Sequence, residues 1–164
     1  MFEVNPSILI EAPIEKIWAY MLDIENWWLR SNPEHIYLEL LSGDKQLQLG
    51  SKITIKEKVG GIPCTAVGCI SKFEKYKQVT WEAEAVYKYM GMTVQVQEGV
   101  DWLFKPIKDK YQLEAHVWAV FPKGFKGKML EWYAKTFLKI VEKDYEHAMI
   151  ELEYIKIEIE KLNR

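Results

Sequence analysis

The sequence predicts an α+β fold in which one strand, two short helices and a six-strand antiparallel meander precede a long C-terminal helix. Three observations carry this prediction. After His35 the spacing of apolar residues changes from the 3.6-residue period of a helix to the two-residue period of a strand. The links between successive apolar runs are short turns, which cannot hold helical crossovers, so neighbouring strands must pair antiparallel. After Pro122 a helical pattern continues to the end of the chain.

The first elements are a short strand and two helices. Residues 7–11 form a β-type run that ends before Pro13, and proline suits the first helical position because an N–H there would have no partner. Apolar residues then recur at the helical spacing i, i+3, i+4 and i+7, as Ile14, Ile17, Trp18 and Met21. A second short helix begins at Asp23 and ends at Asn32, before a proline.

Six further strands are predicted from alternating polarity and from turn residues in the gaps, such as Ser42-Gly43-Asp44. Their ranges are 36–42, 51–59, 63–73, 78–88, 92–105 and 110–121. Cys64 and Cys69 fall in one of these strands, about 16 Å apart along it, which is too far for a disulfide. We therefore expect two free thiols.

A single long helix is predicted from about residue 124 to the end of the chain. Its apolar residues fall near one face and include Leu130, Phe137, Val141, Ala148, Leu152, Ile155 and Ile159. A helix of about 35 residues would span roughly 52 Å, which exceeds the width of a domain of this size. The sequence therefore predicts that the helix either breaks or protrudes. Residues 155–159 also alternate like a strand, so a helix is least strongly indicated there.

Composition indicates one globular domain, residues 1–164. The chain is 49% hydrophobic and 28% charged, and it contains no linker, internal repeat or low-complexity segment. A net charge of −2 with interspersed signs argues against nucleic acid as a partner, because binding phosphates requires a basic face. No run approaches the roughly 18 apolar residues of a membrane span. Residues 1–11 lack the pattern of a secretory signal, so we expect a cytoplasmic protein.

Three segments are similar to the SRPBCC superfamily, which contains START-like and polyketide-cyclase-like proteins. They are SILIEAPIEKIW at 7–18, DIENWW at 23–28 and WLFKP at 102–106, and with the element order they cover essentially the whole chain. The resemblance implies a helix-grip fold. In that fold a seven-stranded curved antiparallel sheet carries two short helices after strand 1, and the long C-terminal helix packs on its concave face. A cavity between sheet and helix is also implied.

Strand alternation indicates which side chains would line such a cavity. In the strands 78–88 and 110–121, alanines share a face with larger apolar residues, and small residues facing the helix would leave space beneath it. The alternative is close packing, with Trp132 or Phe137 filling that space. The predicted lining residues are Trp27, Ile55, Glu57, Trp81, Ala83, Ala85, Val96, Glu98, Trp102, Leu113, Ala115, Val117, Trp132 and Phe137.

Two acids interrupt otherwise apolar strand faces. Glu57 or Glu98 would have a raised pKa in an apolar pocket and could act as acid, base or ligand anchor. The alternative for Glu98 is a bulge near Gly99 that turns its side chain into water.

The three histidines are scattered along the sequence, and none has metal-binding spacing with another histidine, a cysteine or a nearby acid. Asp144, His147 and Glu151 share a helix face, which is typical of a solvated stripe. We therefore expect no metal site and no cofactor.

The favoured function is binding of a small hydrophobic molecule, lipid-like or aromatic, in the internal cavity. A second function, implied by the resemblance, is that of a polyketide cyclase or aromatase. Glu57, Glu98 and Tyr87 are the candidates for moving protons in such an enzyme, although the sequence contains no recognisable catalytic motif.

A third function is that of a protein-interaction module, because the resemblance extends to activators of chaperone ATPases. In this case the C-terminal helix would offer Ile155, Ile159 and Leu162 as the seam of a homodimer. The alternative is that this stripe packs against the chain's own sheet.

Overall fold

The computed structural model describes residues 1–41, 43 and 46–162, and this part of the chain forms eight strands and four helices. The helices are α1 (Ile14–Leu22), α2 (Ile24–Ser31), α3 (Phe125–Thr136) and α4 (Ile140–Leu162). The strands are β1 (Phe2–Val4), β2 (Ser7–Ile10), β3 (His35–Leu40), β4 (Lys52–Val59), β5 (Ile62–Glu74), β6 (Gln78–Tyr89), β7 (Met92–Ile107) and β8 (Lys110–Val120). The predicted turn at 42–44 lies mostly outside the described residues.

The strands form one antiparallel sheet in the order β1–β8–β7–β6–β5–β4–β3, and β2 also pairs with β8. The predicted meander is therefore confirmed, with β1 as an additional strand. Pro6 separates β1 from β2 because it has no N–H to donate to the ladder. Its carbonyl still accepts a 2.9 Å hydrogen bond from the Ala115 N–H, which holds both short strands on β8.

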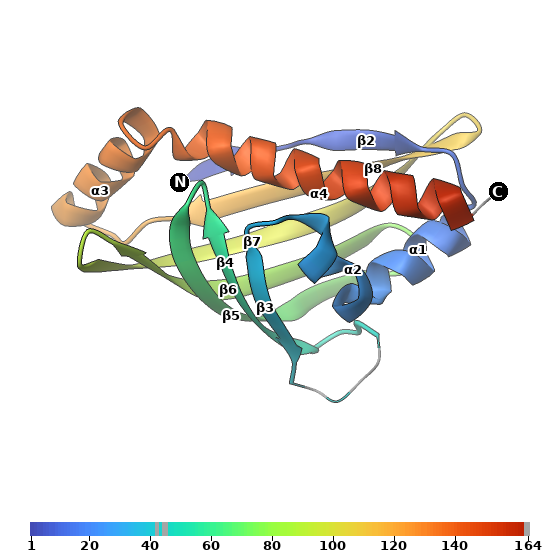
Figure 1. The fold of residues 1–164 in the computed structure, drawn as a ribbon, viewed down its shortest axis with the longest axis horizontal. Coiled ribbons are helices and arrows are strands. Elements are labelled where there is room, and N and C mark those ends of the chain that lie inside the picture. The colour runs from blue at the N-terminus through green and yellow to red at the C-terminus, as the bar shows by residue number, and fades with distance from the viewer. Residues whose placement is uncertain (42, 44–45, 163–164) are drawn as a thin grey trace.

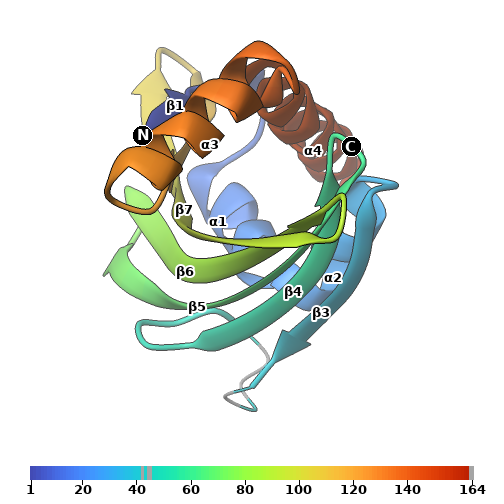
Figure 2. The same cartoon turned by 90° about the vertical axis from the view of Figure 1, so that its left-hand side faces the viewer.

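α4 packs on the concave side of the curved sheet, which confirms the helix-grip architecture (Figures 1 and 2). Leu152, Ile155 and Ile159 point toward the sheet and are each 1% exposed. Residues 155–159 are helical, not extended. Because Ile155 and Ile159 are buried within the chain, the predicted dimer seam through them is wrong. Dimerisation through other residues of the helix stays a prediction.

The predicted single C-terminal helix is broken between α3 and α4. The Phe137 N–H donates to the Tyr133 carbonyl at the end of α3, and the Lys143 N–H donates to the Lys139 carbonyl at the start of α4. Lys139 itself has φ = 50°, the left-handed conformation that a helix cannot continue through. The excess length predicted a break or an overhang, but no proline or glycine marks the position of the break.

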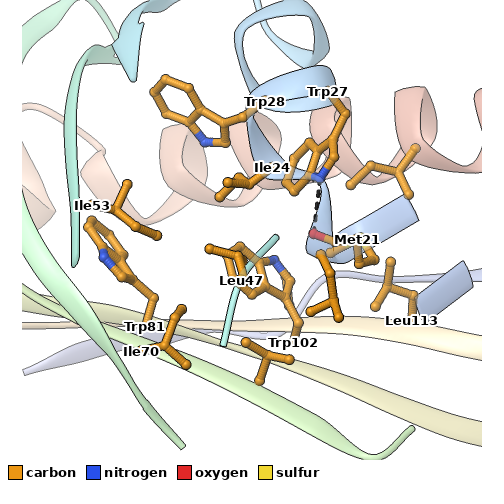
Figure 3. Packing of buried hydrophobic residues seen from close by; sticks show 14 of the residues in the cluster. Met21, Ile24, Trp27, Trp28, Leu47, Ile53, Ile70, Trp81, Trp102 and Leu113 are labelled. Atoms are coloured by element: carbon orange, nitrogen blue, oxygen red, sulfur yellow. Dashed lines mark hydrogen bonds between the residues drawn. The ribbon is translucent and has the colours of Figure 1, made fainter. Parts of the chain in front are cut away.

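Aromatic side chains fill the space between the sheet and helices α1 and α2 (Figure 3). Trp27 is fully buried, donates from Nε1 to the Met21 carbonyl at 3.2 Å, and meets the Trp102 ring edge-on. Trp18 packs edge-on against the rings of Phe73 and Tyr76 and meets the Phe104 ring at a tilted angle. These aromatic side chains pack beneath the C-terminal half of α4, and a cavity lies nearer its N-terminal half.

The described helices include none that combines the length and apolar character needed to cross a lipid bilayer.

Candidate functional site

A cavity of about 100 Å³ lies between the sheet and the N-terminal half of α4. Its floor is mainly apolar and includes Trp81 of β6, Trp102 of β7 and the small residues Ala115 and Ala119 of β8. Ile140, Asp144, His147, Ala148 and Glu151 of α4 form its roof. The small side chains of β8 leave this space, as the alternation of that strand predicted.

The structure places the predicted lining residues in three different surroundings. Ile55, Trp81, Glu98, Trp102, Ala115 and Val117 border this cavity. Val96 borders a second cavity of about 90 Å³ beneath α3, which shares Phe2, Tyr87, Ala119 and Ile140 with the first. Trp27, Ala83, Ala85 and Leu113 pack in the surrounding core. Glu57 is also buried, in the histidine cluster described below.

Trp132 and Phe137 neither line nor fill the cavity, which corrects both predictions made for them. Their side chains are 57% and 61% exposed and contact each other edge to face at 5.4 Å. The physical reason is the break at Lys139, which turns α3 away from the axis of α4. The two aromatic rings therefore lie on the outer surface of α3.

Glu98 lies at the cavity wall, paired with a tyrosine. The Tyr87 hydroxyl donates a 2.6 Å hydrogen bond to Oε2 of Glu98. The register of β7 with both neighbours runs unbroken through Gly99, so the bulge that would have turned Glu98 outward does not occur. Burial raises the pKa of Glu98 to about 8, although the bond from Tyr87 lowers it. At neutral pH the carboxyl is therefore mostly protonated and keeps an O–H donor.

Trp81, which also lines the cavity, has an unused hydrogen-bond donor on the part of its ring that lies against Gly68. Its indole Nε1–H is buried and has no hydrogen-bond partner among the described residues. The ring lies over Gly68 of β5, where a Cβ atom would come within 2.7 Å of Nε1. A buried donor without an acceptor costs about 1–3 kcal/mol. An acceptor atom on a bound molecule would recover that free energy.

Two histidines and two glutamates meet beside the cavity. His35 begins β3 directly opposite Glu57 of β4, and His147 and Glu151 lie one turn apart on α4. Nε2 of His35 is 3.1 Å from Nε2 of His147 and 2.9 Å from Oε1 of Glu151. Oε2 of Glu57 is 3.4 Å from Nε2 of His35 and 3.3 Å from Nε2 of His147. All four donor atoms lie within 4.8 Å of one another, a spacing that could hold a metal ion.

The outer nitrogen of each imidazole is held by its own acceptor. Nδ1 of His35 lies 2.6 Å from the Trp28 carbonyl oxygen, and the His35 ring stacks on the Trp28 indole at 3.6 Å. Nδ1 of His147 lies 3.2 Å from Oε2 of Glu34. The Glu34 carboxylate also accepts hydrogen bonds from the N–H groups of Gly60 and Gly61. Both rings are therefore fixed with Nε2 facing the centre of the cluster.

Charge and burial act in opposite directions on this cluster. Burial lowers the pKa of both histidines, but hydrogen bonds to Glu151 and Glu57 outweigh it and raise the pKa of His35 to about 9 and of His147 to about 11. Burial likewise raises the pKa of Glu151, while the two histidines lower it to about 2. The two carboxylates thus require positive charge between them.

This cluster overturns the prediction that the histidines are scattered and that His147 and Glu151 lie on a solvated stripe. His147 is 7% exposed, and the Glu151 side chain is 16% exposed. The i, i+4 spacing of His147 and Glu151 was the one local signal of the cluster. His35 and Glu57 join it only through the pairing of β3 with β4 and the docking of α4, which no local pattern reveals.

No protein-family model matches the sequence, and no curated protein matches it either. Solved structures do match. The Zhui aromatase/cyclase from Streptomyces sp. R1128 is 14% identical, with a TM-score of 0.63 over 99% of this chain and 96% of that one. A START superfamily protein from Mycobacterium smegmatis is 12% identical, with a TM-score of 0.59 over 98% of both chains. The di-domain ARO/CYC StfQ of the steffimycin biosynthetic pathway is 11% identical, with a TM-score of 0.66 over 98% of this chain and 52% of its own.

These similarities confirm the predicted resemblance at the level of the fold. The chain has the helix-grip architecture of START-like and aromatase/cyclase proteins over essentially its whole length.

Proposed function

We propose that this protein binds a small, mainly apolar molecule that carries a hydrogen-bond acceptor, in the cavity beneath α4. The observation that carries the proposal is an apolar cavity lined by Trp81, whose Nε1–H is buried and has no hydrogen-bond partner among the described residues. Ligand sites are typically apolar with a few placed polar groups, and this cavity has that composition. The same fold in START-superfamily and aromatase/cyclase proteins supports the role.

The volume of the cavity limits the size of the ligand. Sites for drug-sized molecules have volumes of about 300–1,000 Å³, whereas an apolar cavity of about 150 Å³ accepts benzene. A cavity of about 100 Å³ is smaller than this, so a molecule with one ring would require modest movement of the lining side chains, and a lipid or a poly-ketone chain would require much more. A longer ligand requires movement of the side chains that separate the two cavities, among them Phe2 and Tyr87.

Two donors on residues that line the cavity would orient the ligand, the one on Trp81 after the indole turns its Nε1–H toward the bound molecule. Nε1 of Trp81 offers one N–H, and the protonated carboxyl of Glu98 offers one O–H while its other oxygen accepts from Tyr87. Both are donors at neutral pH, so the complementary group on the ligand is a carbonyl or ether oxygen. The remaining wall favours an aromatic or branched aliphatic body.

The test compares two probes of nearly equal shape, acetophenone with its carbonyl and cumene without one. Titration followed by heteronuclear NMR should show both probes bound, with acetophenone bound more tightly. Trp81→Phe should weaken acetophenone about 3- to 10-fold, the value of one hydrogen bond, and leave cumene nearly unchanged. Trp132→Phe, at an exposed indole, is the matched control and should change neither affinity. Equal losses for both probes would contradict the role of the Trp81 donor.

A second candidate is catalysis of proton transfer, favoured by the paired Tyr87 and Glu98 at the cavity wall. A carboxyl with a pKa of about 8 can act as an acid or a base near neutral pH. The test is the rate of deuterium exchange at the central carbon of a cyclic 1,3-diketone. Catalysis by the wild type that is lost in Glu98→Gln, with probe binding retained, would support this activity. Equal rates in the two proteins would exclude it.

A further inference from the structure

We propose that His35, Glu57, His147 and Glu151 form a binding site for one divalent transition-metal ion of the zinc class. The four residues come from three elements, β3, β4 and α4, which the fold brings together from distant parts of the sequence. The proposal is independent of the apolar ligand, because all four donors belong to the chain. His147 and Glu151 also border the cavity, so the ion would lie beside it.

The spacing of the donor atoms fits a tetrahedral ion. Zinc binds imidazole nitrogen and carboxylate oxygen at about 2.0–2.2 Å, so a tetrahedron around it has edges of roughly 3.3–3.6 Å. Nε2 of His35 and Nε2 of His147 are 3.1 Å apart, and each lies 2.9–3.1 Å from Oε1 of Glu151. Their distances to Oε2 of Glu57 are 3.4 and 3.3 Å. These five edges lie at or a few tenths of an ångström below the tetrahedral value.

The tautomers of the two histidines leave their lone pairs facing the centre. Nδ1 of His35 faces a backbone carbonyl, which can only accept, so Nδ1 carries the proton of the neutral ring. Nδ1 of His147 faces the Glu34 carboxylate, which fixes the same tautomer. A metal-binding histidine commonly donates its other ring N–H to a carbonyl or carboxylate in this way. Both partners are present here.

A divalent cation at the centre would balance the two carboxylate charges of the cluster without protonating either histidine. With neutral imidazoles, four electron-pair donors and two carboxylate charges converge with no hydrogen between them. With protons alone, either two imidazolium Nε2–H groups repel each other 3.1 Å apart in a buried site, where the side chains of His35 and His147 are 0% and 7% exposed, or one imidazolium donates to the other ring and leaves one carboxylate charge unbalanced. A single divalent ion contacts all four donors and removes that repulsion.

The chemical type of the four ligand atoms indicates which metal ions the site would prefer. Two imidazole nitrogens with two carboxylate oxygens suit Zn²⁺ and its first-row neighbours, whereas Mg²⁺ and Ca²⁺ prefer ligand sets made of oxygen alone. A soft ion such as Cu⁺ would require sulfur, and neither Cys64 nor Cys69 belongs to the cluster. Four protein ligands in a tetrahedron are typical of a closed zinc site.

The test uses the full chain, purified without a metal-affinity tag, stripped with a chelator and titrated with Co²⁺ and then with Zn²⁺. Co²⁺ should bind one ion per chain and show the intense visible absorption of a tetrahedral centre, and Zn²⁺ should displace it. Absence of stoichiometric binding, or the weak absorption of an octahedral ion, would overturn the proposal. In that case the cluster is an imidazolium–carboxylate network only.

Single substitutions test whether the ion binds at these four residues. His147→Gln and Glu151→Gln should each abolish the tetrahedral Co²⁺ spectrum, and Glu34→Gln should weaken Zn²⁺ binding about 10- to 100-fold by releasing the His147 ring. The control is His116→Gln, because His116 also lies between two carboxylates, Asp101 and Glu3, but at the surface. A wild-type spectrum in His147→Gln, or loss of the spectrum in His116→Gln, would overturn the assignment. Backbone amide NMR spectra verify that each variant is folded.

Discussion

Tyr87 and Glu98 lie on paired strands, and the tyrosine hydroxyl donates a 2.6 Å hydrogen bond to the glutamate carboxyl at the wall of the cavity. This contact places a titratable group in largely apolar surroundings. The titratable groups that act on it lie on four elements: Cys64 of β5, Tyr87 of β6, Glu57 of β4 and Asp144 of α4. None of them is a cation. The carboxyl therefore remains protonated well above the usual range.

The first prediction is a pH dependence of stability that originates in Glu98. The folded state keeps this proton up to a pKa of about 8, whereas the unfolded chain loses it near 4.5. Between these values the folded state binds more protons, so the free energy of unfolding falls as pH rises. The contribution is complete below pH 4.5 and lost above about pH 8. Denaturant unfolding should show a decline across this window to which Asp144 and the buried histidines also contribute, and Glu98→Gln should remove a few kcal/mol of it. An unchanged slope in the variant would contradict the burial of this carboxyl.

The second prediction contrasts a buried indole with an exposed one. Trp27→Ala should lower the free energy of unfolding by about 3–5 kcal/mol, because the fully buried ring leaves a cavity and frees the Met21 carbonyl. Trp132→Ala should change it by no more than about 0.5 kcal/mol, since that ring is 57% exposed. Urea unfolding measures both. A large loss in Trp132→Ala would place this residue in the interior after all.

The third prediction concerns the break between α3 and α4. Lys139 has a left-handed φ of 50°, which glycine adopts without the roughly 1–2 kcal/mol cost of a side chain. Lys139→Gly should therefore leave the free energy of unfolding unchanged or raise it by about 1 kcal/mol. Lys128→Gly, inside α3, should lower it by about 1 kcal/mol. A loss of the same size at Lys139 would indicate a continuous helix.

The fourth prediction concerns the two free thiols. Cys64 is buried, and desolvation together with Glu98 and Glu57 raises the pKa of its thiol well above the ordinary value. Cys69 is only partly buried. An aromatic disulfide reagent should therefore react much faster with the thiol of Cys64→Ser than with that of Cys69→Ser. Similar rates in the two variants would show that β5 opens readily near Cys64.

The sequence predicted those parts of the fold that depend on local periodicity. The alternation of β4 to β8 and the short turns between them were sufficient for the meander, but they left the orientation of Glu98 open until the unbroken register of β7 excluded a bulge at Gly99. β1 was missed because three residues before a proline give no pattern. The break at Lys139 was not located because its left-handed conformation is adopted by a lysine and not by a glycine.

The sequence predicted the candidate site only where the alternation of side chains along a strand determines which of them face the cavity. Ala115 and Val117 reach the cavity wall because of their alternation in β8, whereas Trp132 was assigned to the interior on the assumption of a continuous helix. The contact between His35 and His147 spans 112 positions and depends on three-dimensional docking. No local spacing encodes such a contact.

The most direct test of the binding proposal is to locate a bound molecule by NMR. With acetophenone added to isotopically labelled protein, intermolecular nuclear Overhauser effects should connect its protons to the methyl groups of Ala115, Val117, Ala119 and Ala148, which surround the cavity. Ala66 and Ala12, buried methyl groups that do not border the cavity, should show none. Contacts with methyl groups that border the cavity, these four among them, and none with Ala66 or Ala12 are the predicted result. Contacts only with surface residues, or no contacts at all, would contradict the proposal that this cavity binds a ligand.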